Sequence, residues 1–575
     1  MAETGNGVAV PGGRMGTAAM TDGSPRRRRV SLALMLLLSA AAALLVALGR
    51  PGWPAVALWG GGVLLALGVV LAELGLPRPG RQFALVALVA LAAVGLRMGL
   101  SSPARIHGDE LITAYFSATE DLSAARFFAH VPQVRGEWVS QFPTPFFLLQ
   151  RAFFALFGES IAAVRWSVQP WVWLSLVLLF YLARELLDGA AGWLALPLAS
   201  CLAISLYLET LALHFISSTA LLLAFLLAGA RAVRTGSTGW AVAAGLACGG
   251  CYLFYTSSYL ALPVLGVVMA WAVIRRRWTV LRQGVVTLLV CTALLLPFAA
   301  AARHYNYFSS RWMQVSLWSG QWSDLPERAA RGESRLGAIA AHGVNCLRSL
   351  VERDRGGHGG YFFERQAMLE PFSALLLGAG VLLALARLRR DPGLGVVLVV
   401  VAGAFASGMV LTIPPPAFHR FSVAFPLLAL LMALPLQAAW AAPWPARRLR
   451  VLAVAAAVTL FAALNLGHFA RGSWNEQAPE ELRLGEYLNS RFPHKKLYMA
   501  AFPGYAYAKF AYFAPVRRAG PTVTGYHADL LEGFDAGEDY LYVIAMPDIF
   551  GPQFQALDPH GRLRRFSAQY ALFFN

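Results

Sequence analysis

The sequence predicts a polytopic α-helical membrane protein that ends in a small α/β domain. Of its 575 residues, 57% are hydrophobic and only 14% are charged, a balance typical of chains with many membrane spans. Hydropathy in windows of about 19 residues gives about 13 apolar segments before residue 470. After residue 471 the composition becomes that of a soluble domain of about 100 residues, within the usual range for a domain.

The apolar segments define a predicted membrane domain at residues 30–470. The first is too long for the core of a signal peptide and is predicted to be retained as a span. The seventh and eighth are separated by a turn at 255–259 that is also compatible with a shallow re-entrant bend. In order, the predicted spans are 30–49, 54–74, 83–100, 163–182, 190–206, 215–230, 240–253, 258–274, 281–300, 372–385, 394–413, 422–439 and 451–467.

Arginines set the predicted orientation. The formal net charge is +17, and most arginines stand in short clusters at the ends of apolar segments, as at 26–29 and 275–277. This placement indicates membrane topology rather than nucleic-acid binding, and the positive-inside rule makes the clustered side cytoplasmic. The polar tail at 1–29 is then cytoplasmic, whereas the long loops 101–162 and 301–371 and the C-terminal domain 471–575 face outward.

The C-terminal domain is predicted from its hydrophobic periodicity. Residues 480–492 have the pattern of an amphipathic helix, and 496–502, 540–546 and 562–574 have the pattern of strands. Residues 505–513 are read as a further helix between the strands. The domain carries no obvious catalytic motif.

An adjacent acidic pair, Asp109 and Glu110, follows the third span. The preceding Gly108 permits a tight backbone turn next to the acids. A carboxylate in an outer pocket is able to act as general base on an acceptor hydroxyl or amine, or to hold a divalent cation with a second acid. The alternative for such a pair is a solvated loop acid or a helix N-cap.

Arg165 stands near the outer end of the fourth span, where the positive-inside rule makes an arginine least expected. An arginine in this position needs a counter-charge. The predicted partners are Glu159, Glu209 and Asp109, and a lipid phosphate is the alternative.

Several motifs together resemble a known family, the C-type (GT-C) integral-membrane glycosyltransferases. The closest branch is glycosyltransferase family 39, with the protein O-mannosyltransferases and the bacterial aminoarabinose transferase of lipid A. The resemblance covers 94–277 and extends weakly to 468. It is carried by Gly108-Asp109-Glu110, Pro143-Thr144-Pro145, Phe157-Gly158-Glu159-Ser160, Ala163-Val164-Arg165 and Tyr181-Leu182-Ala183-Arg184.

The resemblance implies an enzyme of the EC 2.4 type, a hexosyl- or pentosyltransferase. Such an enzyme takes a sugar from a polyprenyl-phosphate donor and passes it to a lipid, protein or glycan acceptor at the outer face of a bacterial-type inner membrane. Membrane lipids are its other expected partners. The alternative is a transporter or flippase of a lipid-linked sugar, which should carry ionisable residues near mid-span and an internal repeat. Few mid-span ionisable residues and no clear repeat are found.

The same resemblance assigns roles to residues. Asp109 would be the catalytic base, with Glu110 as its neighbour. A second acid is expected between the fifth and sixth spans, where Glu209 lies in the right neighbourhood and His214 stands where relatives often carry Asp. A divalent metal is therefore an open question, with Asp109, Glu209 and His214 as candidate ligands.

The leaving phosphate of the donor needs a cation on the outer side. His419 and Arg420, before the twelfth span, form a basic pair against the positive-inside trend and are predicted to contact it. Arg303, His304 and Tyr305, after the ninth span, are predicted as second-choice phosphate contacts.

Overall fold

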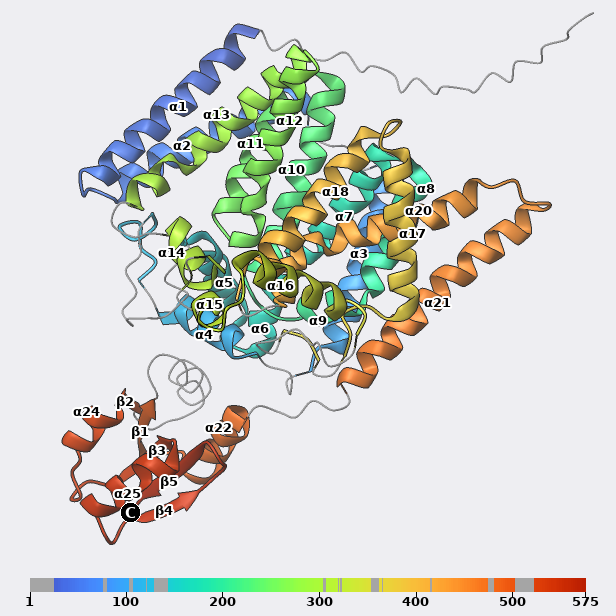
Figure 1. Cartoon of the computed structure of the whole chain (residues 1–575). Helices are drawn as coiled ribbons and strands as arrows, with labels where there is room; N and C mark the ends of the chain where they lie inside the picture. The colour runs from blue at the N-terminus through green and yellow to red at the C-terminus, as the bar shows by residue number, and fades with distance from the viewer. Residues whose placement is uncertain are drawn as a thin grey trace, which may run out of the picture.

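The computed structural model describes residues 25–75, 80–102, 107–119, 121–128, 143–302, 307–318, 320, 323–352, 361–363, 366–413, 416–473, 480–501 and 522–575. These residues form a large helical bundle, followed by a small domain built on one sheet (Figure 1). The predicted fold class is thereby confirmed.

The bundle consists of helices of very different length, and the short ones gather at one end of it (Figure 1). We call this end, where α4, α5, α6, α14 and α16 lie, the loop end. The helices of the bundle are α1 (Pro25–Ala47), α2 (Trp53–Leu74), α3 (Arg81–Leu100), α4 (Gly108–Thr119), α5 (Pro145–Phe157), α6 (Ile161–Trp166), α7 (Gln169–Leu186), α8 (Gly189–Cys201), α9 (Ala203–Leu208), α10 (Phe215–Thr235), α11 (Thr238–Tyr252), η2 (Thr256–Leu260), α12 (Ala261–Ile274), α13 (Trp278–Ala301), α14 (Tyr307–Val315), α15 (Leu325–Ala330), α16 (Arg335–Ser349), α17 (Pro371–Arg387), α18 (Pro392–Phe405), η3 (Ala406–Val410), α19 (Phe418–Phe421), η4 (Ser422–Ala424), α20 (Phe425–Ala441) and α21 (Arg447–Ser473).

Within the described residues, ten helical segments are long and apolar enough to cross a membrane. Each of the thirteen predicted spans coincides with a helix, but the fifth, seventh and tenth correspond to α8, α11 and α17. These helices have 13, 15 and 17 residues, fewer than the ~20 that cross a bilayer without help from neighbouring segments. The multi-pass membrane fold is therefore confirmed, whereas the count of thirteen is not. The turn at 255–259 forms most of η2, which leads directly into α12.

The fifth predicted span is interrupted at Leu202. This residue leaves the helical conformation with ψ 120°, so α8 ends and the short, fully buried helix α9 begins. The backbone N–H of Ala203 donates to Oδ1 of Asn465 on α21 at 3.0 Å. A side chain from the last helix of the bundle thus supplies the acceptor that the broken helix lacks.

The N-terminal pair α1 and α2 packs on α11 and α13. Glu73 on α2 pairs with Arg28 on α1 at 2.6 Å and accepts hydrogen bonds from Ser237 Oγ at 2.7 Å and from the Gly239 N–H at 2.6 Å. A Cβ at Gly239 would stand 2.8 Å from Cβ of Glu73, so the close approach requires glycine here. We call this arrangement the Glu73 clamp.

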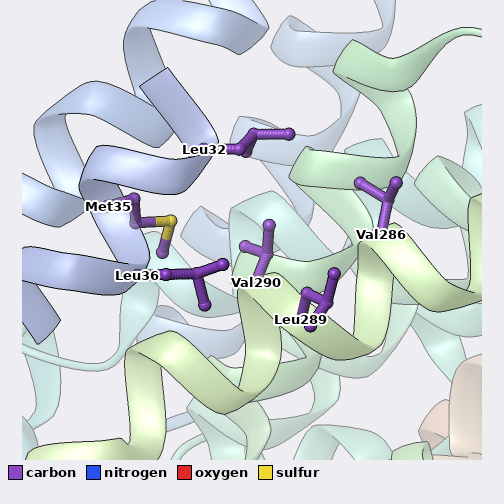
Figure 2. Close-up of a pocket in the computed structure, with 6 residues that line it drawn as sticks. All are labelled: Leu32, Met35, Leu36, Val286, Leu289 and Val290. Atoms are coloured by element: carbon purple, nitrogen blue, oxygen red, sulfur yellow. The ribbon is translucent and has the colours of Figure 1, made fainter. Parts of the chain in front are cut away.

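A small pocket between α1 and α13 is lined only by apolar side chains (Figure 2). It lacks any group that could carry out chemistry, so it does not compete as an active site. Its lining is Leu32, Met35, Leu36, Val286, Leu289 and Val290.

The C-terminal domain is a five-stranded sheet in the order β2-β1-β3-β5-β4. β1 pairs in parallel with β2 and β3, and β5 is antiparallel to β3 and β4. Leu484 and Leu488 of α22 pack on one face, and Phe554 of α25 packs on the other. The elements are α22 (Glu480–Arg491), β1 (Lys496–Ala501), β2 (Thr522–Tyr526), α24 (His527–Glu532), β3 (Tyr540–Ala545), α25 (Pro547–Leu557), β4 (Arg562–Arg565) and β5 (Tyr570–Phe574).

The predictions for this domain hold in part. The helix at 480–492 and the strands at 496–502 and 540–546 are present as α22, β1 and β3. The single strand predicted at 562–574 is instead a hairpin of β4 and β5, because the chain turns between Arg565 and Tyr570. The helix predicted at 505–513 lies outside the described residues.

Candidate active site

Asp109 and Glu110 lie in the first turn of α4, at the loop end. The positive end of the helix dipole favours negative charge at this position. Neither residue is a solvated loop acid, since the two are only 6% and 1% exposed. Their carboxylates nevertheless have different surroundings, which separates their roles.

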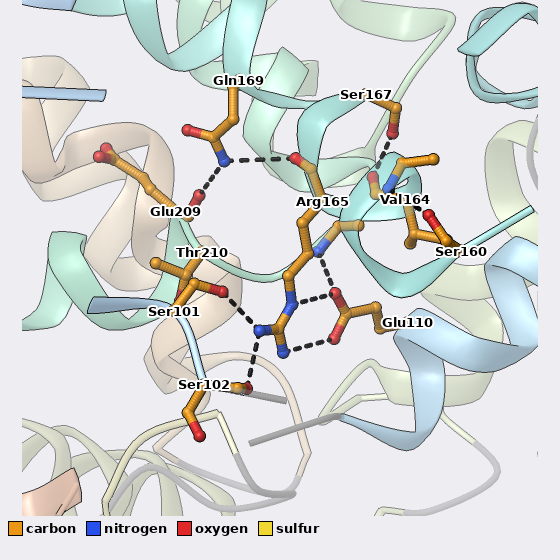
Figure 3. A network of polar contacts seen from close by, with 12 residues as sticks. Ser101, Ser102, Glu110, Ser160, Val164, Arg165, Ser167, Gln169, Glu209 and Thr210 are labelled. Carbon is orange, nitrogen blue, oxygen red and sulfur yellow. Dashed lines mark hydrogen bonds and ion pairs between the residues drawn. The ribbon is translucent and has the colours of Figure 1, made fainter. Parts of the chain in front are cut away.

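Both carboxylate oxygens of Glu110 face the guanidinium of Arg165 (Figure 3). Its Oε1 lies 3.0 Å from Nε of Arg165 and 3.1 Å from the backbone N of Ala212, and its Oε2 lies 3.5 Å from Nη2 of Arg165. The same guanidinium also donates to Ser101 Oγ and to the Ser102 carbonyl. Arg165 therefore pairs with Glu110, and not with Glu159, Glu209 or Asp109 as the sequence suggested.

Glu209 is held by a second buried ion pair. Its Oε2 lies 2.6 Å from Nε of Arg97, and the fully buried Arg97 also donates to the carbonyls at the end of α8, among them that of Ser200 at 3.1 Å. Burial raises the pKa of the Glu209 carboxyl, and the charge of Arg97 acts in the opposite direction. Gln169 links the two ion pairs, because its amide donates to the backbone carbonyls of Glu209 at 3.0 Å and Arg165 at 3.4 Å (Figure 3).

Asp109 faces a group of aromatic side chains. It accepts a hydrogen bond from the hydroxyl of Tyr361, and its backbone N–H donates to Nδ1 of His107 at 3.1 Å. The ring of Tyr361 lies between two imidazoles, with centroids 4.3 Å from His107 and 3.8 Å from His419. A single side chain, that of Tyr361, thus contacts both Asp109 and His419, one of the predicted phosphate contacts.

Two arginine side chains lie close to the Tyr361 and His419 rings. Arg420 is 5% exposed and donates to the Ile413 carbonyl at 3.0 Å. Its other electrostatic neighbours include Tyr255, Tyr361 and Arg311 of α14. The two guanidinium groups therefore stand near His419, which is one tyrosine ring away from Asp109, an arrangement suited to a phosphate close to a base.

His214 lies at the edge of the same group. Its ring contacts Tyr255 with centroids 4.7 Å apart and Phe146 with centroids 5.7 Å apart. Burial, together with the smaller effect of the nearby Arg311 charge, lowers the pKa of this imidazole to about 3. His214 is therefore neutral at physiological pH. Arg303, His304 and Tyr305 lie outside the described residues.

The candidate ligands do not fit a divalent cation. Glu209 is engaged by Arg97 and Asp109 by Tyr361, and no group of three or more His, Cys, Asp or Glu side chains converges in the part of the chain that the structure describes. A cation held by Asp109, Glu209 and His214 would have to share these carboxylates with Tyr361 and Arg97, each of which occupies one of the carboxylate oxygens.

Some site residues had no role in the sequence-based prediction. Arg97 stands near the outer end of the third span, so the argument applied to Arg165 would have selected it. His107 is two residues from Asp109. Tyr361 was not selected, because nothing in a run of aromatic loop residues indicates a contact with an acid 252 residues away.

Comparison with known proteins supports the predicted family resemblance. Residues 142–300 match the family described as dolichyl-phosphate-mannose-protein mannosyltransferase. Over 171 residues the chain is 29% identical to the undecaprenyl phosphate-alpha-4-amino-4-deoxy-L-arabinose arabinosyl transferase of Edwardsiella ictaluri (strain 93-146). The aligned part is 27% of this chain and 30% of that relative, so the match spans under a third of the relative's length.

Solved structures extend the similarity in fold to most of the chain. ArnT from Cupriavidus metallidurans in the apo state superposes with a TM-score of 0.54 at 14% identity, covering 86% of this chain and 98% of that one. The same protein bound to undecaprenyl phosphate gives 0.52 at 12% identity, with 85% and 97% covered. The apo oligosaccharyltransferase of Archaeoglobus fulgidus gives 0.51 at 13%, with 82% and 70% covered. The GT-C fold predicted from the sequence is confirmed.

Proposed function

We propose that this chain, which has the GT-C fold and a mannosyltransferase-family domain at residues 142–300, transfers a sugar from a polyprenyl-phosphate donor. The acceptor is a lipid, protein or glycan, and Asp109 is the general base. One observation carries the proposal: a buried carboxylate lies one tyrosine ring away from the His419–Arg420 pair. Base and cation are the two groups that a single displacement at an anomeric carbon needs.

In the proposed reaction an acceptor hydroxyl or amine attacks the anomeric carbon of the donor sugar. Asp109 takes the proton of the attacking group while the bond between the anomeric carbon and the phosphate oxygen breaks. The electron pair of that bond leaves with the polyprenyl phosphate, whose added charge is stabilised by Arg420 and Arg311. In this step the Tyr361 hydroxyl stays on Oδ2 of Asp109 and orients the carboxylate, while Oδ1 takes the proton.

The donor class rests on the relatives. The curated relative is named for undecaprenyl phosphate, and one similar structure was solved with undecaprenyl phosphate bound. We propose the same class of carrier lipid here, in a bacterial-type inner membrane. The loop end would face outward, since the arginine clusters indicate that the opposite end is cytoplasmic. A reporter fused after Arg471 should be active only outside the cytoplasm.

The proposal is tested with purified enzyme in nanodiscs and radiolabelled polyprenyl-phosphate sugars. Release of free polyprenyl phosphate together with a labelled acceptor supports transfer. Movement of the intact lipid-linked sugar between leaflets, without cleavage of its phosphate bond, would instead establish a flippase and overturn the proposal.

Arg420→Ala is expected to lower kcat/KM for the donor about 10²-fold, because the charge that develops on the leaving phosphate loses its nearest buried guanidinium. Arg420→Lys should retain part of the activity, since it keeps the charge but not the planar fork. Arg331→Ala, which removes an arginine whose side chain is 62% exposed at the loop end, is the matched control and should match wild type. Equal activity of all three variants would remove Arg420 from the site.

EDTA treatment is expected to leave the transfer rate unchanged, because the candidate metal ligands are held by Arg97 and Tyr361. A metal-dependent glycosyltransferase assayed in the same buffer serves as the control. Loss of activity that returns on addition of Mg²⁺ or Mn²⁺ would show that Asp109 or Glu209 changes partners to bind a cation.

A further inference from the structure

A short aromatic segment crosses the loop end between Asp109 and the last helix of the bundle. We call residues 361–363 the aromatic strap. Tyr361, Phe362 and Phe363 have no regular secondary structure, yet they are only 9%, 2% and 4% exposed. Their position is therefore set by the side chains around them and not by a backbone ladder. The first of the three donates its hydroxyl to Asp109.

The strap is held by the loop end of α21. The ring of Phe363 lies 5.4 Å from that of Phe469 on α21 and 4.8 Å from that of Tyr207 on α9. The ring of Phe362 lies 5.5 Å from the same Tyr207 and 6.2 Å from the imidazole of His468. Two adjacent rings of the strap thus pack against the final turns of α21 and against the helix that leads to Glu209.

At Gly472, α21 lies against the strap with no side chain between them. A Cβ built on this residue would stand 2.2 Å from Cδ2 of Phe363 and 2.3 Å from its Cγ. Gly472 is buried in the last turn of α21, one residue before the helix ends at Ser473. The missing side chain is what lets the Phe363 ring lie directly on the helix backbone.

We infer that Gly472 is a positioning residue. Because it has no side chain, the Phe363 ring packs directly on the backbone of α21, and this packing places the Tyr361 hydroxyl on Asp109. This inference rests on the proposed function, in which Asp109 is the base. A side chain at 472 must displace Phe363, and Tyr361 is only two residues away along a segment with no other regular support. Because α21 leads into the C-terminal domain, the same contact ties the helix that carries this domain to the carboxylate.

The test compares two glycines on one helix. Gly472→Ala is expected to lower kcat about tenfold or more, because a displacement near 1 Å is enough for such losses, while KM for the donor stays unchanged. Gly467→Ala is the matched control: five residues earlier on α21, its Cβ would have no described atom within 4 Å. It should have the activity of wild type.

Two further variants separate positioning from loss of packing. Gly472→Ala combined with Phe363→Leu should recover most of the lost kcat, because the smaller side chain makes room for the new methyl group. Tyr361→Phe and Gly472→Ala should not be additive, since both act through the same hydroxyl. All variants are measured on the full chain in nanodiscs, with thermal unfolding as a check on folding.

The outcomes are distinguishable. If Asp109→Asn is inactive but Gly472→Ala behaves like Gly467→Ala, the positioning role is wrong and the proposed function stands. Full additivity with Tyr361→Phe, or no recovery by Phe363→Leu, also overturns it. If Asp109→Asn keeps full activity, the proposed function itself has failed.

Discussion

Replacing Asp109 by asparagine is expected to lower glycosyl transfer by about 10²–10⁴-fold, the usual contribution of a positioned general base. Asparagine has nearly the same shape and still accepts the hydrogen bond of the Tyr361 hydroxyl, but it cannot take the proton of the acceptor. The loss should therefore appear in kcat, with KM for the donor little changed. The measurement is the initial rate of transfer from a radiolabelled polyprenyl-phosphate sugar in nanodiscs.

Asp121→Asn is the matched control for this experiment. Asp121 belongs to the same long loop, and its side chain is 56% exposed next to Arg126. This variant should transfer sugar at the rate of wild type. Full activity of Asp109→Asn, in protein that is folded and inserted, would contradict the assignment of Asp109 as base.

Replacing Glu110 by alanine is expected to destabilise the fold by about 3–5 kcal/mol, because it leaves the guanidinium of Arg165 buried without its counter-charge. The two side chains are only 1% and 3% exposed, so water cannot take the place of the carboxylate. The backbone N–H of Ala212 loses its acceptor at the same time. The measurement is thermal unfolding followed by tryptophan fluorescence.

Two comparisons test whether the loss comes from the buried pair. Glu333→Ala breaks an ion pair with Arg328, in which the Glu333 side chain is 42% exposed, and should cost about 0–1 kcal/mol. Glu110→Leu combined with Arg165→Met removes both charges and should recover much of the stability. Equal stability of Glu110→Ala and Glu333→Ala would show that Arg165 reaches another counter-charge.

Hydropathy was sufficient to locate all ten described helical segments that are long enough to cross a membrane, because such segments are apolar over most of their length. It could not tell α8 from a full span, since the interruption at Leu202 depends on Asn465, an acceptor 262 residues from the Ala203 N–H that it binds. Neighbouring helices decide where a helix inside the bundle ends. A sliding hydropathy window contains no information about these neighbours.

At the candidate site, too, the sequence identified individual residues but not their distant partners. Asp109, Glu110 and Arg165 stood out because charge next to a membrane span is costly and needs an explanation. That rule selects residues but does not pair them, and the pairs Arg165–Glu110 and Arg97–Glu209 differ from those expected. This rule could not select Tyr361, because an uncharged aromatic residue in a loop does not have the energetic cost of a charge next to a membrane span.

The Glu73 clamp has a consequence for how the chain is made. Ser237 follows Glu73 by 164 residues, so during synthesis this carboxylate at the end of α2 is made long before two of its partners exist. Arg28 precedes Glu73 and lies on the adjacent helix of the same pair, which neutralises the acid as soon as α1 and α2 meet. The first two helices are therefore able to insert with the charge of Glu73 already neutralised by Arg28. The remaining two contacts of Glu73 form later, once the first turn of α11 has been synthesised.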